Sequence, residues 1–160
     1  MGADIYLKSV NSKCQKKNDR LFKSWALRRD QANEEGNKLE AARCQKKVSF
    51  YYDAMYAEGY FRDSYNGTSL FQRLGLSWWG LPINKKGLLP IAEMIKLRAK
   101  LEVATIPVVT KEELLKQGCS VDEGENSPTS WTKYFEGKKA DLITLLDKGI
   151  ELGEPLYCSV

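Results

Sequence analysis

Helical periodicity on both sides of one turn is the feature that most constrains the fold of this chain. Apolar side chains recur at three- and four-residue spacing before and after Gly36-Asn37, a dipeptide that ends helices. Asn11 or Ser12 can cap a first helix that reaches Glu35, and a second helix is expected over 38–58. The sequence therefore predicts an antiparallel helical hairpin.

Further helices are expected in the remainder of the chain. Thr68 can cap a short helix that ends before Gly75, and the apolar run over 88–103 predicts a central, deeply buried helix. Thr110 to Glu113 has the pattern of a capping box, and Ser127-Pro128 is typical of another helix start. The acidic stretch between these last two helices is predicted to be a mobile loop.

Both chain ends have the character of short strands. Residues 3–10 alternate loosely between apolar and polar side chains, and 155–160 do the same. We expect the two ends to pair. The fold class is therefore predicted as mainly α, a compact helical domain of about five or six helices with a two-stranded β element formed by the chain termini.

The length of 160 residues, with 42% hydrophobic and 29% charged side chains, suits one soluble domain spanning 1–160. No apolar run approaches the roughly 20 residues that cross a bilayer. The start, Met1-Gly2-Ala3-Asp4, lacks the basic and apolar stretches of a secretory signal. These features predict a cytoplasmic protein without a membrane partner.

Strong catalytic and metal-binding signals are missing from the sequence. It has no histidine, and its cysteines (Cys14, Cys44, Cys119 and Cys158) lack the paired spacing of a zinc site. We expect reduced thiols, no metal, no cofactor and no catalytic residue, hence not an enzyme. Two alternatives stay open: a thiolate activated by a neighbouring cation, and Glu58 with Asp63 as an acid and base pair.

Charge is unevenly distributed although the net charge is only +4. Residues 11–57 contain 11 Lys or Arg against 6 Asp or Glu, whereas 106–160 contain 6 against 10. One interpretation is a set of solvated helix faces that partly neutralise one another. The other is a patch on the hairpin that binds nucleic acid or an acidic protein. The candidate side chains are Lys13, Lys16, Lys17, Arg20, Lys23, Arg28 and Arg29.

A second candidate site follows the hairpin, where aromatic, charged and turn-forming residues are concentrated. A cation, a carboxylate and flat rings close in sequence can hold a phosphate and stack on a base. The candidate ligand-binding residues are Tyr60, Arg62, Asp63, Tyr65, Asn66 and Trp78. The alternative is structural: Arg62 and Asp63 pair internally, Phe61 and the two tryptophans fill the core, and Asn66-Gly67 forms only a turn.

Several of these segments together resemble a known group of sequences. Gly2-Ala3-Asp4-Ile5-Tyr6, the Tyr60–Asn66 string, Leu74–Trp79 and Gly153–Leu156 are similar to a family of small hypothetical proteins of bacteriophages and prophages. The resemblance implies a phage-like origin and action by binding host components. It implies no activity, cofactor or catalytic residue.

Two functional hypotheses follow. The first is a non-catalytic, phage-like interaction protein that binds a host macromolecule in the host cytoplasm and inhibits a defence component. A host protein is the expected partner, and nucleic acid is the partner if the basic hairpin carries the binding. The second is a small-ligand protein that holds a nucleotide-type molecule through the Tyr60–Asn66 segment.

Overall fold

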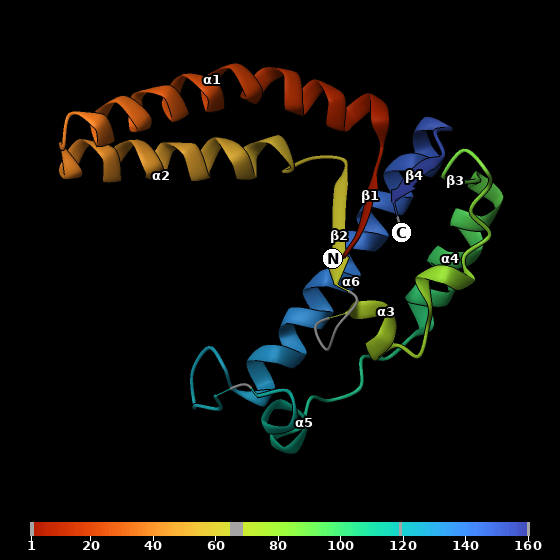
Figure 1. The fold of residues 1–160 in the computed structure, drawn as a ribbon. Helices are drawn as coiled ribbons and strands as arrows, with labels where there is room; N and C mark the ends of the chain where they lie inside the picture. Colours follow the sequence, from red (N-terminus) through yellow and green to blue (C-terminus); the bar gives the residue numbers. More distant parts are fainter. Residues whose placement is uncertain (1, 65–68, 119, 160) are drawn as a thin grey trace. The chain divides into compact units, whose positions relative to one another are not determined.

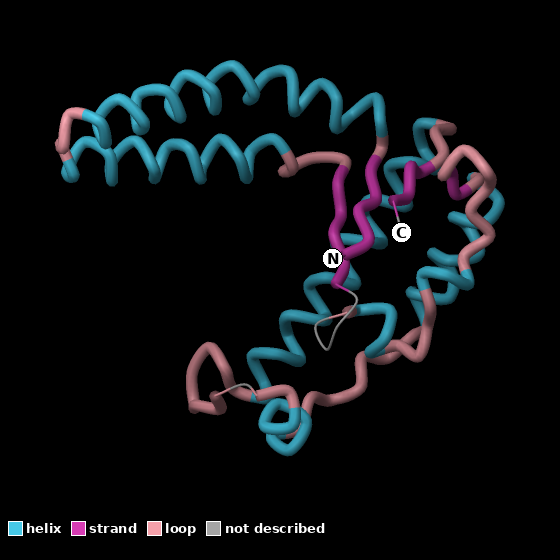
Figure 2. Tube along the Cα trace, in the orientation of Figure 1, coloured by secondary structure: helices cyan, strands magenta, loops and turns pink. Residues whose placement is uncertain are grey.

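The computed structural model describes residues 2–64, 69–118 and 120–159. By their internal contacts these residues form two compact units, one made of 7–60 and one made of the first six residues with 61–160. We describe each unit by itself (Figures 1 and 2). The single domain expected from the length stays a prediction.

The 7–60 unit is the predicted helical hairpin. Helix α1 (Lys8–Glu34) and helix α2 (Lys38–Met55) run side by side and are joined by a tight turn (Figure 1). Gly36 occupies the turn with a φ of 71°, a conformation that glycine adopts without a steric penalty. The Asn37 side chain then accepts a hydrogen bond from the Glu40 amide at 3.1 Å and caps α2.

The start of α1 differs from the prediction. Neither Asn11 nor Ser12 is the cap, because the helix already begins at Lys8 and the preceding strand ends at Tyr6. Asn11 is instead buried in the first turns of α1, where its Nδ2 donates to the carbonyl oxygens of Met55 and Glu58 at 3.3 and 3.4 Å. A side chain with capping chemistry therefore satisfies carbonyls at the end of the neighbouring helix.

The other unit contains a four-stranded sheet in the order β2-β1-β4-β3. Its strands are β1 (Gly2–Tyr6), β2 (Tyr60–Ser64, which begins at the last residue of the hairpin unit), β3 (Leu88–Leu89) and β4 (Leu156–Ser159). β1 and β4 pair antiparallel with Ile5 opposite Cys158, which confirms the pairing of the chain ends. The sheet is larger than the predicted two-stranded element, because β2 and β3 extend it on both sides.

Strand β3 corrects the predicted helix over 88–103. Leu88 and Leu89 pair with Tyr157 and Leu156 of β4, and helix α4 begins only at Ile91. A residue that precedes proline is disfavoured in helical geometry, so Pro90 separates strand from helix.

Helices make up 63% of the structure over the two units, which confirms the mainly α fold class. α4 (Ile91–Val103) packs against the long helix α6 (Pro128–Leu152), with α3 (Leu70–Arg73), α5 (Lys111–Lys116) and the 3-10 turn η1 (Trp78–Gly80) around them. The buried side chains of α4, Met94, Leu97 and Leu101, lie on one face, so this helix is only partly buried, and α6 also contributes one face to the core. The side chains at the centre of the core are Ile5, Phe71, Leu89, Met94, Leu101, Phe135, Leu142, Leu146 and Leu156.

Two helix starts behave as predicted and one shifts. Thr110 and Glu113 form the capping box of α5, and Ser127 caps α6 with Pro128 at its first position. The cap of α3 is Ser69, whose hydroxyl accepts from the Gln72 amide at 3.2 Å. Thr68, the predicted cap, lies outside the described residues.

Candidate functional site

Asp63 is the most densely hydrogen-bonded side chain of the predicted ligand segment. Side chains alternate along β2, so that Phe61 and Asp63 are buried and Arg62 is exposed. Five donors reach the Asp63 carboxylate: Oδ1 accepts from Leu70 N (2.8 Å) and Lys138 Nζ (2.6 Å), and Oδ2 from Ser69 Oγ (2.9 Å), Phe71 N (3.1 Å) and Trp78 Nε1 (2.9 Å). Both carboxylate oxygens are therefore occupied.

The electrostatics of this cluster keep Asp63 ionised. Burial alone raises the pKa of a carboxyl group, but hydrogen bonds from Lys138, Leu70 and Phe71, together with the Lys138 charge, outweigh it and lower the pKa of Asp63 below its ordinary value. A carboxylate with a lowered pKa and no vacant acceptor position is poorly suited to act as a general base. Asp63 instead joins β2, α3, η1 and α6.

Of the other candidates, Trp78 donates its Nε1 to Asp63 but Arg62 does not approach this carboxylate. The Arg62 side chain is on the opposite face of β2, with its Nε 3.7 Å from Asp4 Oδ1, so the expected internal Arg62 to Asp63 pair does not form. Trp78 is buried and its ring stacks on Phe71, with centroids 3.4 Å apart. Tyr65 and Asn66 lie outside the described residues.

Tyr60 belongs to an aromatic row of the hairpin unit. Its ring lies 4.7 Å from that of Tyr56, which continues to Tyr52 at 5.3 Å and to Phe22 at 6.1 Å. These contacts give Tyr60 a packing role in the 7–60 unit.

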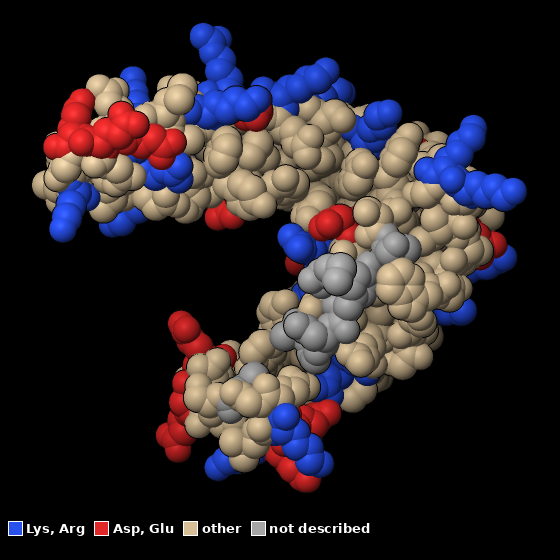
Figure 3. Space-filling model, in the orientation of Figure 1, with Lys and Arg blue, Asp and Glu red and all other residues tan. Residues whose placement is uncertain are grey.

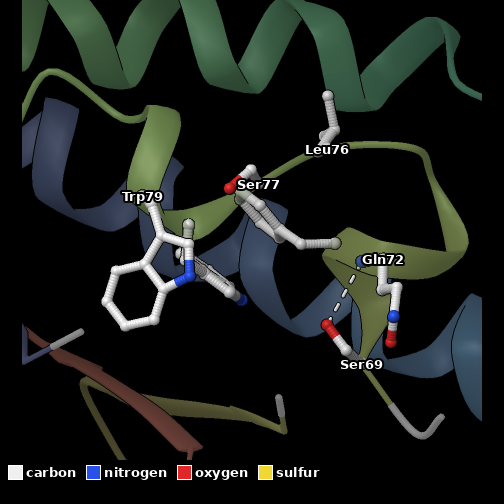
Figure 4. A pocket seen from close by; sticks show the side chains of 7 residues that line it. Ser69, Gln72, Leu76, Ser77 and Trp79 are labelled. Carbon is white, nitrogen blue, oxygen red and sulfur yellow. Dashed lines mark hydrogen bonds between the residues drawn. The ribbon is translucent and has the colours of Figure 1, made fainter. Parts of the chain in front are cut away.

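One small pocket lies beside the Asp63 cluster. Its volume is about 210 Å³, below the range of about 300–1,000 Å³ that is usual for ligand sites. Figure 4 shows Trp79 at its edge and Ser69 hydrogen-bonded to the Gln72 amide. The lining residues are Ser69, Phe71, Gln72, Leu76, Ser77, Trp78 and Trp79, none of which is charged. Trp79 is 69% exposed, so only part of the expected aromatic core is buried.

The basic candidates lie together on α1. Asn11, Cys14 and Asn18 face α2, since each donates to a carbonyl near the end of that helix; Cys14 Sγ and Asn18 Nδ2 reach Ala54 O at 2.9 and 3.1 Å. With 3.6 residues per turn, the exposed cations of 13–28 fall on the opposite face. We define the cationic ridge as Lys13, Lys16, Lys17, Arg20, Lys23 and Arg28. Figure 3 shows Lys and Arg side chains along this edge of α1.

Members of the ridge differ in their contacts. Lys23 pairs with Asp19 at 2.7 Å, and the Arg28 guanidinium lies 5.0 Å from the centroid of the Trp25 ring. Arg29 pairs with Asp30 on another face of the helix. Lys13, Lys16, Lys17 and Arg20 are exposed and form no ion pair with any residue that the structure describes.

The described thiols are free and two of them are poor nucleophiles. Burial, with the Glu40 carboxylate beside it, raises the pKa of Cys44, and burial raises the pKa of Cys158 to about 12. A raised pKa lowers the population of the reactive thiolate. Cys14 uses its thiol to bond α2, and Cys119 lies outside the described residues.

The sequence did not identify the partners that surround Asp63. Lys138 lies 75 residues away, and no local pattern connects the two positions. Ser69 carries the usual signal of a helix cap, which its hydroxyl satisfies while also donating to Asp63. Such a pair is found only when the fold is known or when covariation between the two positions can be measured.

Neither a membrane span nor a metal site is found among the described residues. No helix within them has the length and apolar character to cross a bilayer, and they contain no cluster of three or more His, Cys, Asp or Glu able to hold a metal ion. No protein-family model, curated protein or solved structure matches the chain. The functional argument therefore depends on the geometry described above.

Proposed function

We propose that this protein is a non-catalytic, phage-like interaction protein that binds a host macromolecule through its helical hairpin. The cationic ridge carries the proposal, because four of its six exposed cations, Lys13, Lys16, Lys17 and Arg20, form no ion pair with any described residue. The polar groups around Asp63, in contrast, are occupied by structural hydrogen bonds. We further propose that this binding inhibits a component of host defence in the host cytoplasm.

Three observations support a binding role over catalysis. The chain has no histidine, which is the commonest general base. Its most buried carboxylate is saturated with donors, and the buried thiols have raised pKa values. Asp63, Cys44 and Cys158 are thus committed to structure.

A second candidate function is the binding of a small, nucleotide-type ligand beside Trp79. The pocket next to this exposed ring favours it. The occupied carboxylate of Asp63 and the position of Arg62 on the other face of β2 weigh against it, because neither is presented to that pocket.

The proposal is tested by capture with the tagged full-length chain from bacterial lysate. The ridge variant replaces Lys13, Lys16, Lys17 and Arg20 by Gln, and a control variant replaces four exposed lysines of the other unit, Lys85, Lys86, Lys100 and Lys133. Both lose the same charge. We expect a stoichiometric macromolecular partner that the wild type and the control variant retain and the ridge variant loses.

Native mass spectrometry of the purified protein separates the two candidate functions. A small molecule retained in place of any macromolecule would support the ligand-binding alternative and overturn the interaction proposal. Equal capture by the ridge variant, or substrate turnover that depends on one carboxylate or thiol, would overturn it as well.

A further inference from the structure

We infer that the partner of the cationic ridge is the phosphate backbone of a nucleic-acid duplex. This inference rests on the proposed function and names the chemical class of the partner. Three features of α1 support it: the position of the ridge, the repulsion among its charges and the lack of fully exposed aromatic rings beside them.

The ridge lies along one face of α1. Residues 13 to 28 of α1 cover about 22 Å at a rise of about 1.5 Å per residue. Six cations share this length, so their mean separation along the axis is about 4.5 Å. A duplex carries one phosphate charge per about 1.7 Å of its own axis, so a rod with this charge spacing can contact several phosphates at once.

Concentrating these charges opposes helix stability. Lys13, Lys16, Lys17 and Arg20 repel one another, because like charges at three- and four-residue spacing destabilise a helix. A bound polyanion offsets this repulsion. The concentration of positive charge itself does not stabilise the folded helix.

The surroundings of the ridge favour a duplex over a single strand. Base stacking on a single strand needs exposed aromatic rings among the cations. The aromatic residues of α1, Phe22 and Trp25, are half-buried, and Phe22 packs on Tyr52 of α2. The ridge can thus bind phosphates without reading bases, as expected for duplex binding that is independent of sequence.

A protein partner suits this face less well. Protein interfaces are anchored by buried aromatic or aliphatic side chains, with charged residues depleted at their centre. Leu27, 71% exposed, is a large apolar side chain within this face, with Lys23 one turn before it and Arg28 next to it in sequence. The hairpin turn of a second copy is the one acidic protein surface to be tested directly. It carries Glu34, Glu35 and Glu40, which are opposite in charge to the ridge.

The test is fluorescence anisotropy with the full-length chain and labelled DNA of arbitrary sequence. For a duplex of about 20 base pairs we expect the plot of log K against log salt to have a slope of about −4, since each phosphate contact contributes about −0.9. The ridge variant should bind at least about 10-fold more weakly and with a shallower slope, and the control variant should match the wild type. A single strand of equal length should bind less tightly than the duplex.

Two further measurements distinguish a loss of binding from a loss of folding. Replacement of Lys13, Lys16 and Lys17 by Arg preserves the charge and should retain duplex binding. Thermal unfolding followed by circular dichroism should show the ridge variant at least as stable as the wild type, because four repelling charges are gone. The inference would be contradicted if the ridge variant bound more weakly but was also less stable than the wild type, and the Arg variant lost duplex binding as well.

The outcomes also distinguish this inference from the proposed function. Salt-insensitive binding, equal loss in the control variant, or preference for the single strand would overturn the duplex inference. Ridge-dependent capture of a protein without duplex binding would overturn it and leave the proposed function standing. Concentration-dependent dimers of the wild type that the ridge variant lacks, seen by analytical ultracentrifugation without DNA binding, would assign the ridge to a second copy. Absence of any ridge-dependent partner would overturn both proposals.

Discussion

Lys138 Nζ and Asp63 Oδ1 lie 2.6 Å apart and join α6 to β2 in an ion pair that is almost closed to solvent. The Asp63 side chain is fully buried and that of Lys138 is 12% exposed. Because four more donors complete the carboxylate shell, the pair is part of a fully satisfied polar network rather than an isolated charge contact.

Replacing Asp63 by Asn should destabilise the unit that contains it. The substitution leaves the Lys138 ammonium without its counter-charge in a nearly closed site, a change that typically costs about 3–5 kcal/mol. Chemical denaturation monitored by tryptophan fluorescence measures the loss. Asp4→Asn is the matched control: it breaks the exposed contact with Arg62 and should change stability by less than about 1 kcal/mol. Equal effects of the two substitutions would show that the network adds little.

Acid should weaken the fold through the same carboxylate. Folding lowers the pKa of Asp63 below its ordinary value of about 3.9. At a pH between the folded and the ordinary pKa, the carboxyl group is therefore protonated in more of the unfolded chains than of the folded ones. The stabilisation is complete above the ordinary value and is lost as the pH falls through the folded pKa. Unfolding free energies measured from pH 6 downwards should therefore decrease below about pH 4. The decrease should be smaller in Asp63→Asn; an identical pH profile would contradict the assignment.

Asn11→Ala should loosen the hairpin. The substitution removes the donor that reaches the carbonyls of Met55 and Glu58, leaving buried acceptors with fewer partners at a cost of about 1–3 kcal/mol. Hydrogen exchange should show faster amide exchange over the last turns of α2. Ser24→Ala, an exposed change on the outer face of α1, serves as the control and should leave exchange unchanged.

Thr110→Ala should destabilise α5 by about 1 kcal/mol. The Thr110 hydroxyl accepts from the Glu113 amide at 3.2 Å, and the Glu113 carboxylate accepts from the Thr110 amide at 2.9 Å. Glu113 also pairs with Arg73, so the cap connects α5 to α3. Equilibrium denaturation measures the loss, with Thr105→Ala at an exposed position as the comparison. If Thr110→Ala lowered the free energy of unfolding no more than Thr105→Ala, the capping box would make no measurable contribution to stability.

Local patterns in the sequence were sufficient where a structure depends on neighbouring residues. The hairpin turn at Gly36-Asn37, the capping box at Thr110 and the start of α6 at Ser127 each form from residues within one turn of one another. The cationic face of α1 follows from helical periodicity in the same way.

Non-local contacts explain where the predictions departed from the structure. Leu88 and Leu89 belong to an apolar run that reads as a helix, yet they form a strand because Leu156 and Tyr157 offer an edge to pair with. Asn11 has the chemistry of a helix cap, but α2 places carbonyls within its reach.

The sequence by itself determined the mainly helical class, the hairpin, the strand character of the chain ends and the position of the basic residues, since these follow from short-range periodicity and composition. Tertiary structure alone decided the role of Asp63 in the described part of the ligand segment, Tyr60–Ser64. Asp63 resembles a ligand group in the sequence, but Lys138 and the amides of α3 approach it from elements distant along the chain and bind its oxygens. Whether a polar side chain serves folding or recognition depends on which donors the fold brings to it, and helical or strand periodicity carries no information about those donors.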